Sequence, residues 1–273
     1  MTAPPATRPI ELVISDCDGT LFDPSKQVTP RAQQAVASLR ASGIRFTLSS
    51  SRPPSGIESA AALLEVKEPM GTCNGAAVVD AEMVPLIQHC LEPDAARSAI
   101  EILSAHGVDA WAYSASQWWV SDGTNAHVVN EQRNLRRDPL VVSIDSLPEE
   151  EILKIVGVCD DDRVVASAQA AIKSHLGGIV HAECSQDYYL DVTSATVSKG
   201  TCVQEISRLT GIAHAAIAVL GDGHNDLAMF AQAGLSIAMG QSDELVKDAA
   251  DLVTASNGDE GFAQAIERLV LGS

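Results

Sequence analysis

Paired carboxylates follow an apolar run near the start of the sequence. Asp16 and Asp18 lie two residues apart, directly after the stretch 10–14, and a Gly-Thr pair follows them. On a regular strand, residues i and i+2 share one face. If the chain leaves the sheet at Asp16, one carboxylate can act as a nucleophile while the other transfers protons to the same group. Taken alone, the pair fits a catalytic site and a solvated turn equally well.

A second carboxylate cluster follows another apolar run late in the chain. Asp222 and Asp226 come directly after the stretch 217–220 and are interleaved with glycines. Ligand sites in open α/β sheets lie beyond the carboxyl ends of the strands. We therefore expect Asp16, Asp18, Ser50, Asp222 and Asp226 to gather at one edge of a sheet.

Such a gathering of carboxylates favours a bound cation. Close like charges raise each other's pKa, which is unfavourable unless a cation joins them. Mg²⁺ is the natural candidate because it prefers oxygen ligands in octahedral geometry. Lys199 is a further cation, at the predicted start of a helix, where the helix dipole disfavours positive charge. Contact with a phosphate and with Asp16 would explain that position.

Taken together, these motifs resemble the four ordered motifs of the haloacid dehalogenase superfamily of phosphotransferases. The position of an insert between the second and third motifs is similar to its Cof-type (IIB) branch in particular. The resemblance covers nearly the whole chain. The residues that carry it are Asp16-Cys17-Asp18-Gly19-Thr20, Ser50 with Arg52, Asn74-Gly75, Lys199-Gly200 and Gly221-Asp222-Gly223-His224-Asn225-Asp226.

This resemblance implies a role for each catalytic residue. Asp16 would attack phosphorus to form an aspartyl-phosphate, which divides a hard hydrolysis into two easier displacements. Asp18 would act as general acid toward the leaving alcohol and then as base for water. Ser50 would hydrogen-bond a phosphoryl oxygen, and Lys199 would hold Asp16 and the transferring group in line.

The resemblance also implies the metal-binding and substrate-binding residues. Asp16, Asp222 and the backbone carbonyl of Asp18 would bind Mg²⁺, and Asp226 would complete or orient that shell. Substrate binding would involve Arg52, Asn74 and Gly75, although Asn74 could instead shape a turn with Gly75. The second motif departs from the usual Thr-Gly-Arg, because Ser50, Ser51 and Arg52 stand there.

The elements that position these residues predict a fold with two parts. Strands and helices alternate over residues 10–79, which indicates a Rossmann-like, doubly wound parallel α/β sheet. All tryptophans and tyrosines lie between residues 85 and 190, where strand-like runs mix with a long helical stretch. We therefore predict a catalytic core formed by residues 1–84 and 191–273, with an inserted α+β cap domain at 85–190.

Composition narrows the class of protein further. The 273 residues include 46% hydrophobic and 20% charged side chains, and the net charge is −18. Such an acidic surface argues against partners such as nucleic acid or an anionic membrane. The N-terminal nine residues lack the apolar centre of a signal peptide, and no stretch is long enough to span a membrane, so we expect a cytoplasmic protein. Six scattered cysteines indicate neither a zinc site nor a disulfide framework.

These inferences predict a magnesium-dependent phosphatase that acts on phosphomonoesters of small metabolites, sugar phosphates first. A phosphomutase and a dedicated biosynthetic sugar-phosphate phosphatase are alternatives on the same fold. A non-catalytic regulator that binds a phosphorylated metabolite is a third alternative. No motif identifies the substrate or indicates an oligomeric state.

Overall fold

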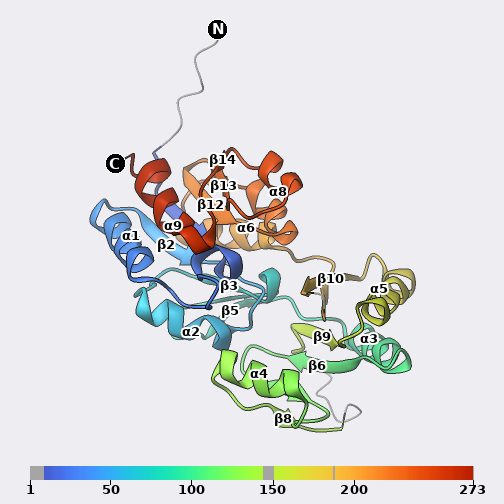
Figure 1. The fold of residues 1–273 in the computed structure, drawn as a ribbon. Helices are drawn as coiled ribbons and strands as arrows, with labels where there is room; N and C mark the ends of the chain where they lie inside the picture. Colours follow the sequence, from blue (N-terminus) through green and yellow to red (C-terminus); the bar gives the residue numbers. More distant parts are fainter. Residues whose placement is uncertain (1–8, 144–150, 187, 273) are drawn as a thin grey trace.

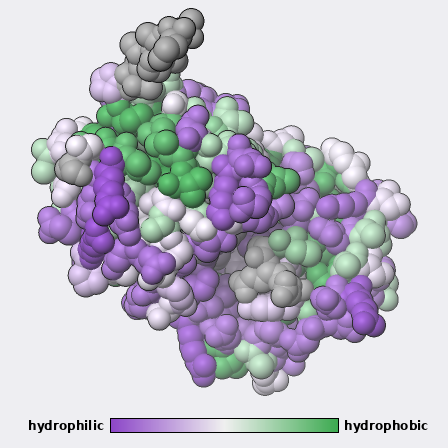
Figure 2. Space-filling view, turned by 45° about the horizontal axis from the view of Figure 1, so that its top comes forward, coloured by the Kyte–Doolittle hydropathy of each residue, from purple (hydrophilic) through white to green (hydrophobic). Residues whose placement is uncertain are grey.

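The computed structural model describes residues 9–143, 151–186 and 188–272. The N-terminal residues considered above therefore lie outside the described part, except residue 9. Within the described residues, no helix is both long and apolar enough to cross a membrane. The face shown in Figure 2 is mostly hydrophilic, in keeping with the net charge of −18.

The core is built on a five-stranded parallel sheet in the order β14-β13-β12-β1-β2. Its strands are β1 (Leu12–Ser15), β2 (Arg45–Leu48), β12 (Ile217–Gly221), β13 (Leu235–Ala238) and β14 (Leu252–Val253). Its helices are α1 (Pro30–Ala41), α2 (Pro54–Leu63), α6 (Lys199–Thr210), α7 (Leu227–Phe230), α8 (Glu244–Ala249) and α9 (Gly261–Gln264), which continues as a π-helical stretch, Ala265–Val270.

Helices cover both faces of this sheet, as the doubly wound prediction requires (Figure 1). Val13 of β1 packs with α1, α2 and α9, whereas its neighbours Leu12 and Ile14 pack with α6, α7 and α8. This division follows from the pleat of a strand, which sends successive side chains to opposite faces. Because both faces are covered, β1 reads as a continuous apolar run. The predicted fold class is confirmed.

A small antiparallel sheet joins the core to the insert. It contains β3 (Met70–Thr72), β4 (Ala77–Val79) and β5 (Pro85–Gln88). The sequence analysis predicted parallel strands over residues 10–79, a range that includes β3 and β4. Instead β3 pairs antiparallel with β4, and a single parallel bridge between Ser49 and Gly71 links it to the end of β2.

The insert contains a six-stranded mixed sheet in the order β10-β11-β9-β6-β7-β8. Its strands are β6 (Asp109–Tyr113), β7 (Trp118–Val120), β8 (Leu140–Val141), β9 (Lys154–Val158), β10 (Val180–Gln186) and β11 (Tyr189–Ser194). Its helices are α3 (Pro93–Ala105), α4 (Ala126–Leu135) and α5 (Asp162–Leu176). We propose junctions near residues 89 and 195. Strand β5 lies within the predicted cap range but pairs with β4 of the small sheet, and β11 crosses the predicted boundary at residue 190 while it pairs with β9 and β10 of the insert.

The two faces of the cap sheet differ. Helices α3 and α5 pack on one face through aliphatic side chains. The opposite face carries an aromatic layer that includes Trp111, Tyr113 and Trp118, and α4 packs on it. Helix α4 also contacts α2 of the core, so this aromatic face is the one turned toward the core (Figure 1).

Candidate active site

The ends of three neighbouring strands assemble the site. Ser15 of β1 lies level with Leu220 of β12 on one side and with Leu48 of β2 on the other. The amide of Asp16 donates to the carbonyl of Leu220 at 2.9 Å, so the register continues past the last paired residues. Asp16, Ser50 and Asp222 therefore follow parallel strands that end at the same edge, as expected from the sequence.

A buried lysine joins the nucleophile candidate to the last motif. Lys199 is the first residue of α6, and its ammonium donates to Asp16 Oδ1 and Asp226 Oδ1, both at 2.6 Å. Burial alone would lower the pKa of Lys199, but the two carboxylates outweigh burial and raise it. Burial raises the pKa of Asp16 well above its usual value, and the charge of Lys199 only partly opposes that rise. The lysine is thus held charged beside Asp16.

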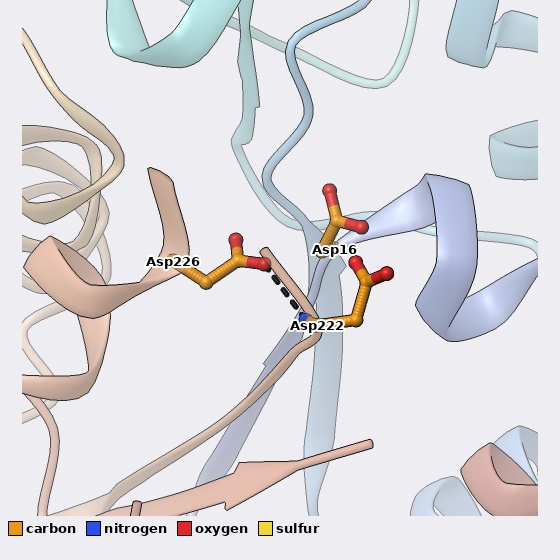
Figure 3. Close-up of side chains that lie close together, drawn as sticks. All are labelled: Asp16, Asp222 and Asp226. Carbon is orange, nitrogen blue, oxygen red and sulfur yellow. Dashed lines mark hydrogen bonds between the residues drawn. The ribbon is translucent and has the colours of Figure 1, made fainter. Parts of the chain in front are cut away.

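Asp226 orients the turn that carries Asp222. Its second oxygen, Oδ2, accepts the amide of Asp222 at 2.8 Å, shown in Figure 3, and the amide of Gly223 at 2.9 Å. Burial, followed by the nearby charge of Asp226, raises the pKa of Asp222 to about 6. Asp226 therefore acts on the geometry of the loop, while the carboxylate of Asp222 is turned toward Asp16 (Figure 3).

These three carboxylates form a set that fits a divalent cation. One oxygen from each of Asp16, Asp222 and Asp226 lies within 4.8 Å of the others. Hard carboxylate oxygens are the donors that Mg²⁺ takes in proteins. The raised pKa values of Asp16 and Asp222 agree with a cluster that gains from a neutralising cation. The side-chain carboxylate of Asp18 lies outside this set and has different partners.

Asp18 belongs to a separate ion-pair group with Arg52 and Lys26. We call this the open side of the site, because the Lys26 side chain is exposed to solvent. Arg52 binds it with two hydrogen bonds, Nε to Oδ2 at 2.6 Å and Nη2 to Oδ1 at 2.8 Å. Lys26 adds a third contact, at 2.7 Å from Oδ1. Burial alone would raise the pKa of Asp18, but Arg52 and Lys26 outweigh burial and lower it to about 2. Asp18 is therefore ionised in this arrangement.

The hydroxyl of Ser50 is fixed by its own loop. Ser50 Oγ accepts the amide of Arg52 at 3.2 Å, which leaves the hydroxyl hydrogen free to donate. Burial raises the pKa of the neighbouring Cys17 thiol, which keeps it protonated beside this loop. Ser50 is buried at the end of β2, beside the other strand-end residues.

Asn74 and Gly75 link the second motif to the third and fourth. The Asn74 side chain accepts a hydrogen bond from Asn225 at 3.0 Å, and its backbone has a left-handed φ of 56°. A Cβ at Gly75 would lie 2.2 Å from the Ser198 carbonyl, immediately before Lys199. A glycine there permits close approach of the two backbones, so the turn helps to place Lys199.

Two contributors to the site were missed by the sequence analysis. Lys26 reaches Asp18 because the chain between them folds back, with Phe22 bridged to Val28. Gln241 donates to the Gly19 carbonyl at 2.6 Å and lies 3.4 Å from Asp222 Oδ2. Neither residue belongs to a motif, and only the return of a loop brings each one to the site.

Comparisons with known proteins find similar hydrolases and phosphatases. A family model described as haloacid dehalogenase-like hydrolase matches residues 13–266. The chain is 26% identical to the pyridoxal phosphate phosphatase YbhA of Escherichia coli, over 95% of this chain and 97% of that one. It is 21% identical to the 5-amino-6-(5-phospho-D-ribitylamino)uracil phosphatase YcsE of Bacillus subtilis, over 96% of each chain.

A solved structure supports the same assignment at the level of the fold. The subclass IIB sugar phosphatase BT4131 superposes with a TM-score of 0.84 at 22% identity, over 95% of this chain and 98% of that one. The family model covers both parts of the core and the insert between them. The chain therefore belongs to the haloacid dehalogenase-like hydrolases, in their Cof-type (IIB) branch, a family of enzymes that hydrolyse phosphate esters.

Proposed function

We propose that this protein is a magnesium-dependent phosphatase that cleaves phosphomonoesters of small metabolites through an aspartyl-phosphate. The observation that carries the proposal is the position of Asp16. Lys199 binds its Oδ1 at 2.6 Å, and among the described residues no hydrogen bond reaches its Oδ2. A carboxylate held on one oxygen and unengaged on the other suits an in-line nucleophile.

In the first step, Asp16 Oδ2 forms a bond to phosphorus while the bond from phosphorus to the ester oxygen breaks. Asp18 transfers a proton to the departing oxygen, and the Ser50 hydroxyl and Lys199 offset charge on the phosphoryl oxygens. In the second step, Asp18 takes a proton from water, whose oxygen attacks phosphorus and releases Asp16 and phosphate.

Arg52 would regulate which of these roles Asp18 can perform. With the ion pair intact, Asp18 is ionised and suited to act as a base. An arriving phosphate offers Arg52 a second anion, which weakens its hold on Asp18 and raises the pKa of that carboxyl. Asp18 could then carry the proton that the leaving alcohol needs.

The metal would be held by Asp16 and Asp222 with the backbone carbonyl of Asp18, and Asp226 would orient the Asp222 loop. Bound Mg²⁺ supplies positive charge that offsets the phosphate and the clustered carboxylates. The residues of this chain supply the nucleophile, the proton transfers and the alignment.

Small phosphorylated metabolites are the substrate class that the relatives support. Their names record activity on pyridoxal phosphate, on a ribitylamino-uracil phosphate and on a sugar phosphate. The cap packs on the core through α4 and α2, which favours compact substrates over folded proteins. Sugar phosphates are our first candidates for this chain, in the cytoplasm.

Release of inorganic phosphate from p-nitrophenyl phosphate, with and without Mg²⁺, tests this proposal. The wild-type protein should hydrolyse p-nitrophenyl phosphate only when Mg²⁺ is present. Asp16→Asn, which keeps the shape of the side chain but removes the nucleophilic oxygen, should lose activity by about a thousandfold or more. Asp94→Asn, at an exposed position on α3, is the matched control and should retain full activity.

Two results would contradict the proposal: a wild-type protein without magnesium-dependent turnover, and an Asp16→Asn variant with normal activity. Isomerisation of a hexose phosphate without net phosphate release would instead indicate a mutase. Binding of phosphorylated metabolites without turnover would indicate a regulator. A panel containing sugar phosphates and pyridoxal phosphate, assayed under common conditions, then ranks the substrates.

A further inference from the structure

Lys154 is a buried cation that extends from the cap into the core. It lies on β9 and is only 6% exposed. Its ammonium lies 2.9 Å from Asp191 Oδ1, donates to the Ser51 carbonyl at 3.1 Å and sits 5.4 Å from the centre of the Tyr113 ring. Ser51 is in the second motif, between Ser50 and Arg52, so this contact joins the cap to the catalytic loop.

The contact falls on the peptide unit that orients the Ser50 hydroxyl. Lys154 holds the carbonyl of the peptide between Ser51 and Arg52, and the amide of the same peptide donates to Ser50 Oγ at 3.2 Å. A peptide unit is planar, with its carbonyl and amide on opposite sides. Fixing the direction of the carbonyl therefore fixes the direction of the amide that Ser50 accepts.

The core holds this loop at its ends. Ser50 binds the backbone of Gly71 and Asn74 at 3.0 Å each, and the Arg52 carbonyl accepts the amide of Cys73 at 2.9 Å. Among the described residues, the Ser51 carbonyl between these points is held by Lys154 of the cap. The cap thus holds the centre of this loop, at Ser51, through Lys154.

Asp191 supports Lys154 from within the cap. It lies on β11, and both of its carboxylate oxygens are buried. Among the described residues, these oxygens have no partner other than the Lys154 ammonium. Burying an ammonium is costly unless an opposite charge accompanies it. Asp191 therefore offsets the cost of placing a lysine at this depth.

We propose that Lys154 is a positioning residue through which the seated cap sets the orientation of the Ser50 hydroxyl, and so completes the phosphoryl-binding site. The proposal rests on the proposed function for the role of Ser50. It couples binding of the phosphoryl group to the position of the cap, through one peptide unit and without direct contact between Lys154 and the substrate.

The test uses the double variant Lys154→Met/Asp191→Asn, which removes both buried charges together and keeps similar side-chain volumes. Binding of inorganic phosphate is measured by calorimetry, in wild type, in Ser50→Ala and in the combined variant. The double variant should bind phosphate about tenfold more weakly, the loss expected for one hydrogen bond of about 1.4 kcal/mol. In the Ser50→Ala background the same double change should weaken binding less than about twofold, because the hydroxyl it positions is absent.

Asp191→Asn alone is the matched control. It removes the counter-charge but keeps the amine that donates to Ser51, so phosphate affinity should stay within about threefold of wild type. Lys154→Arg keeps both a charge and an N–H donor and should also remain within about threefold. This conservative variant provides the comparison if the double variant does not fold.

Three results would overturn the inference: unchanged phosphate affinity in a folded double variant, equal losses with and without the Ser50 hydroxyl, or a loss in Lys154→Arg as large as that in Ser50→Ala. Phosphate binding is measured without turnover, so this test separates the inference from the proposed activity. A protein that binds phosphate in the expected pattern but hydrolyses nothing supports the positioning role and contradicts the hydrolase proposal.

Discussion

Two groups of cations and carboxylates flank the site, and they differ in their access to water. On the closed side, Lys199 joins Asp16 and Asp226, and its side chain is 1% exposed. On the open side, Arg52 and Lys26 share Asp18, and the Lys26 side chain is 52% exposed. The distances between charged atoms are similar, at 2.6–2.8 Å.

The difference between the two sides matches the chemistry proposed for each. Buried ion pairs are strong but rigid, and loss of one partner leaves an uncompensated charge. Exposed pairs are weak and exchange partners readily. A nucleophile benefits from being held in one position, whereas a group that transfers protons must change its charge during the reaction. Asp16 and Asp18, two residues apart, therefore differ in burial, with side chains that are 6% and 30% exposed.

The comparison predicts that removing Lys199 has the largest effect. Lys199→Met should lower the free energy of unfolding at pH 7.5 by about 3–5 kcal/mol, because Asp16 and Asp226 lose their shared cation. Unfolding in urea measures the loss, which should shrink at pH 5 as Asp16, whose pKa is raised by burial, gains a proton. Lys173→Met removes an exposed pair with Glu183 and should change stability by less than about 1 kcal/mol. Equal losses of stability in the two variants would contradict the difference between buried and exposed ion pairs.

Neutralising Asp222 should have the next largest effect, and it should raise the free energy of unfolding rather than lower it. Its pKa is about 6 in the folded metal-free protein against an ordinary value of 3.8, so the folded state binds its proton more tightly than the unfolded chain does. Ionisation therefore costs stability as pH rises from about 4 to 6, and the full cost persists above that range. Asp222→Asn should stabilise the metal-free protein at pH 7.5 by about 1–3 kcal/mol and weaken magnesium binding.

Asp226→Asn is the matched contrast to Asp222→Asn. Asp226 accepts hydrogen bonds from Lys199 and from two backbone amides, so its neutralisation should destabilise the protein. Thermal unfolding in a chelating buffer measures both variants. A fall in the stability of Asp222→Asn in metal-free buffer at pH 7.5 would contradict the assigned cost.

A substitution of Arg52 tests the ion-pair group around Asp18. The pKa of Asp18 is lowered to about 2, so its ion pairs contribute stability that is present above about pH 4 and is lost as pH falls toward 2. Arg52→Gln should therefore lower the free energy of unfolding at pH 7 by about 1–2 kcal/mol, and the gap from wild type should narrow toward pH 3. A gap that widens in acid would refute this assignment.

Lys26 should have the smallest effect. Lys26→Gln removes an exposed contact, so the free energy of unfolding should change by no more than about 1 kcal/mol, and less at high salt. Turnover at varied ionic strength provides a second measurement. A loss comparable to that of Lys199→Met would show that the open side is as rigid as the closed side.

Local sequence signals were sufficient for much of the fold. A Thr-Pro pair is typical of a helix start, and the Thr29 hydroxyl accepts the amide of Ala32 in front of α1. The predicted helix starting at Lys199 is α6. These predictions depend on neighbours within a few residues. The antiparallel pairing of β3 with β4 was not predicted, because it depends on where a hairpin returns, and its residues are equally apolar in either arrangement.

The sequence by itself determined which residues stand at the ends of strands, because apolar runs and turn residues report local structure. It thereby indicated Asp16, Ser50 and Asp222 as neighbours. The expected contact between Lys199 and Asp16 is present. The tertiary structure alone decided two other pairings, Asp18 with Arg52 and Lys154 with Asp191. The physical reason is that electrostatic energy depends on distance in space and on burial, and neither quantity can be read from separation along the chain.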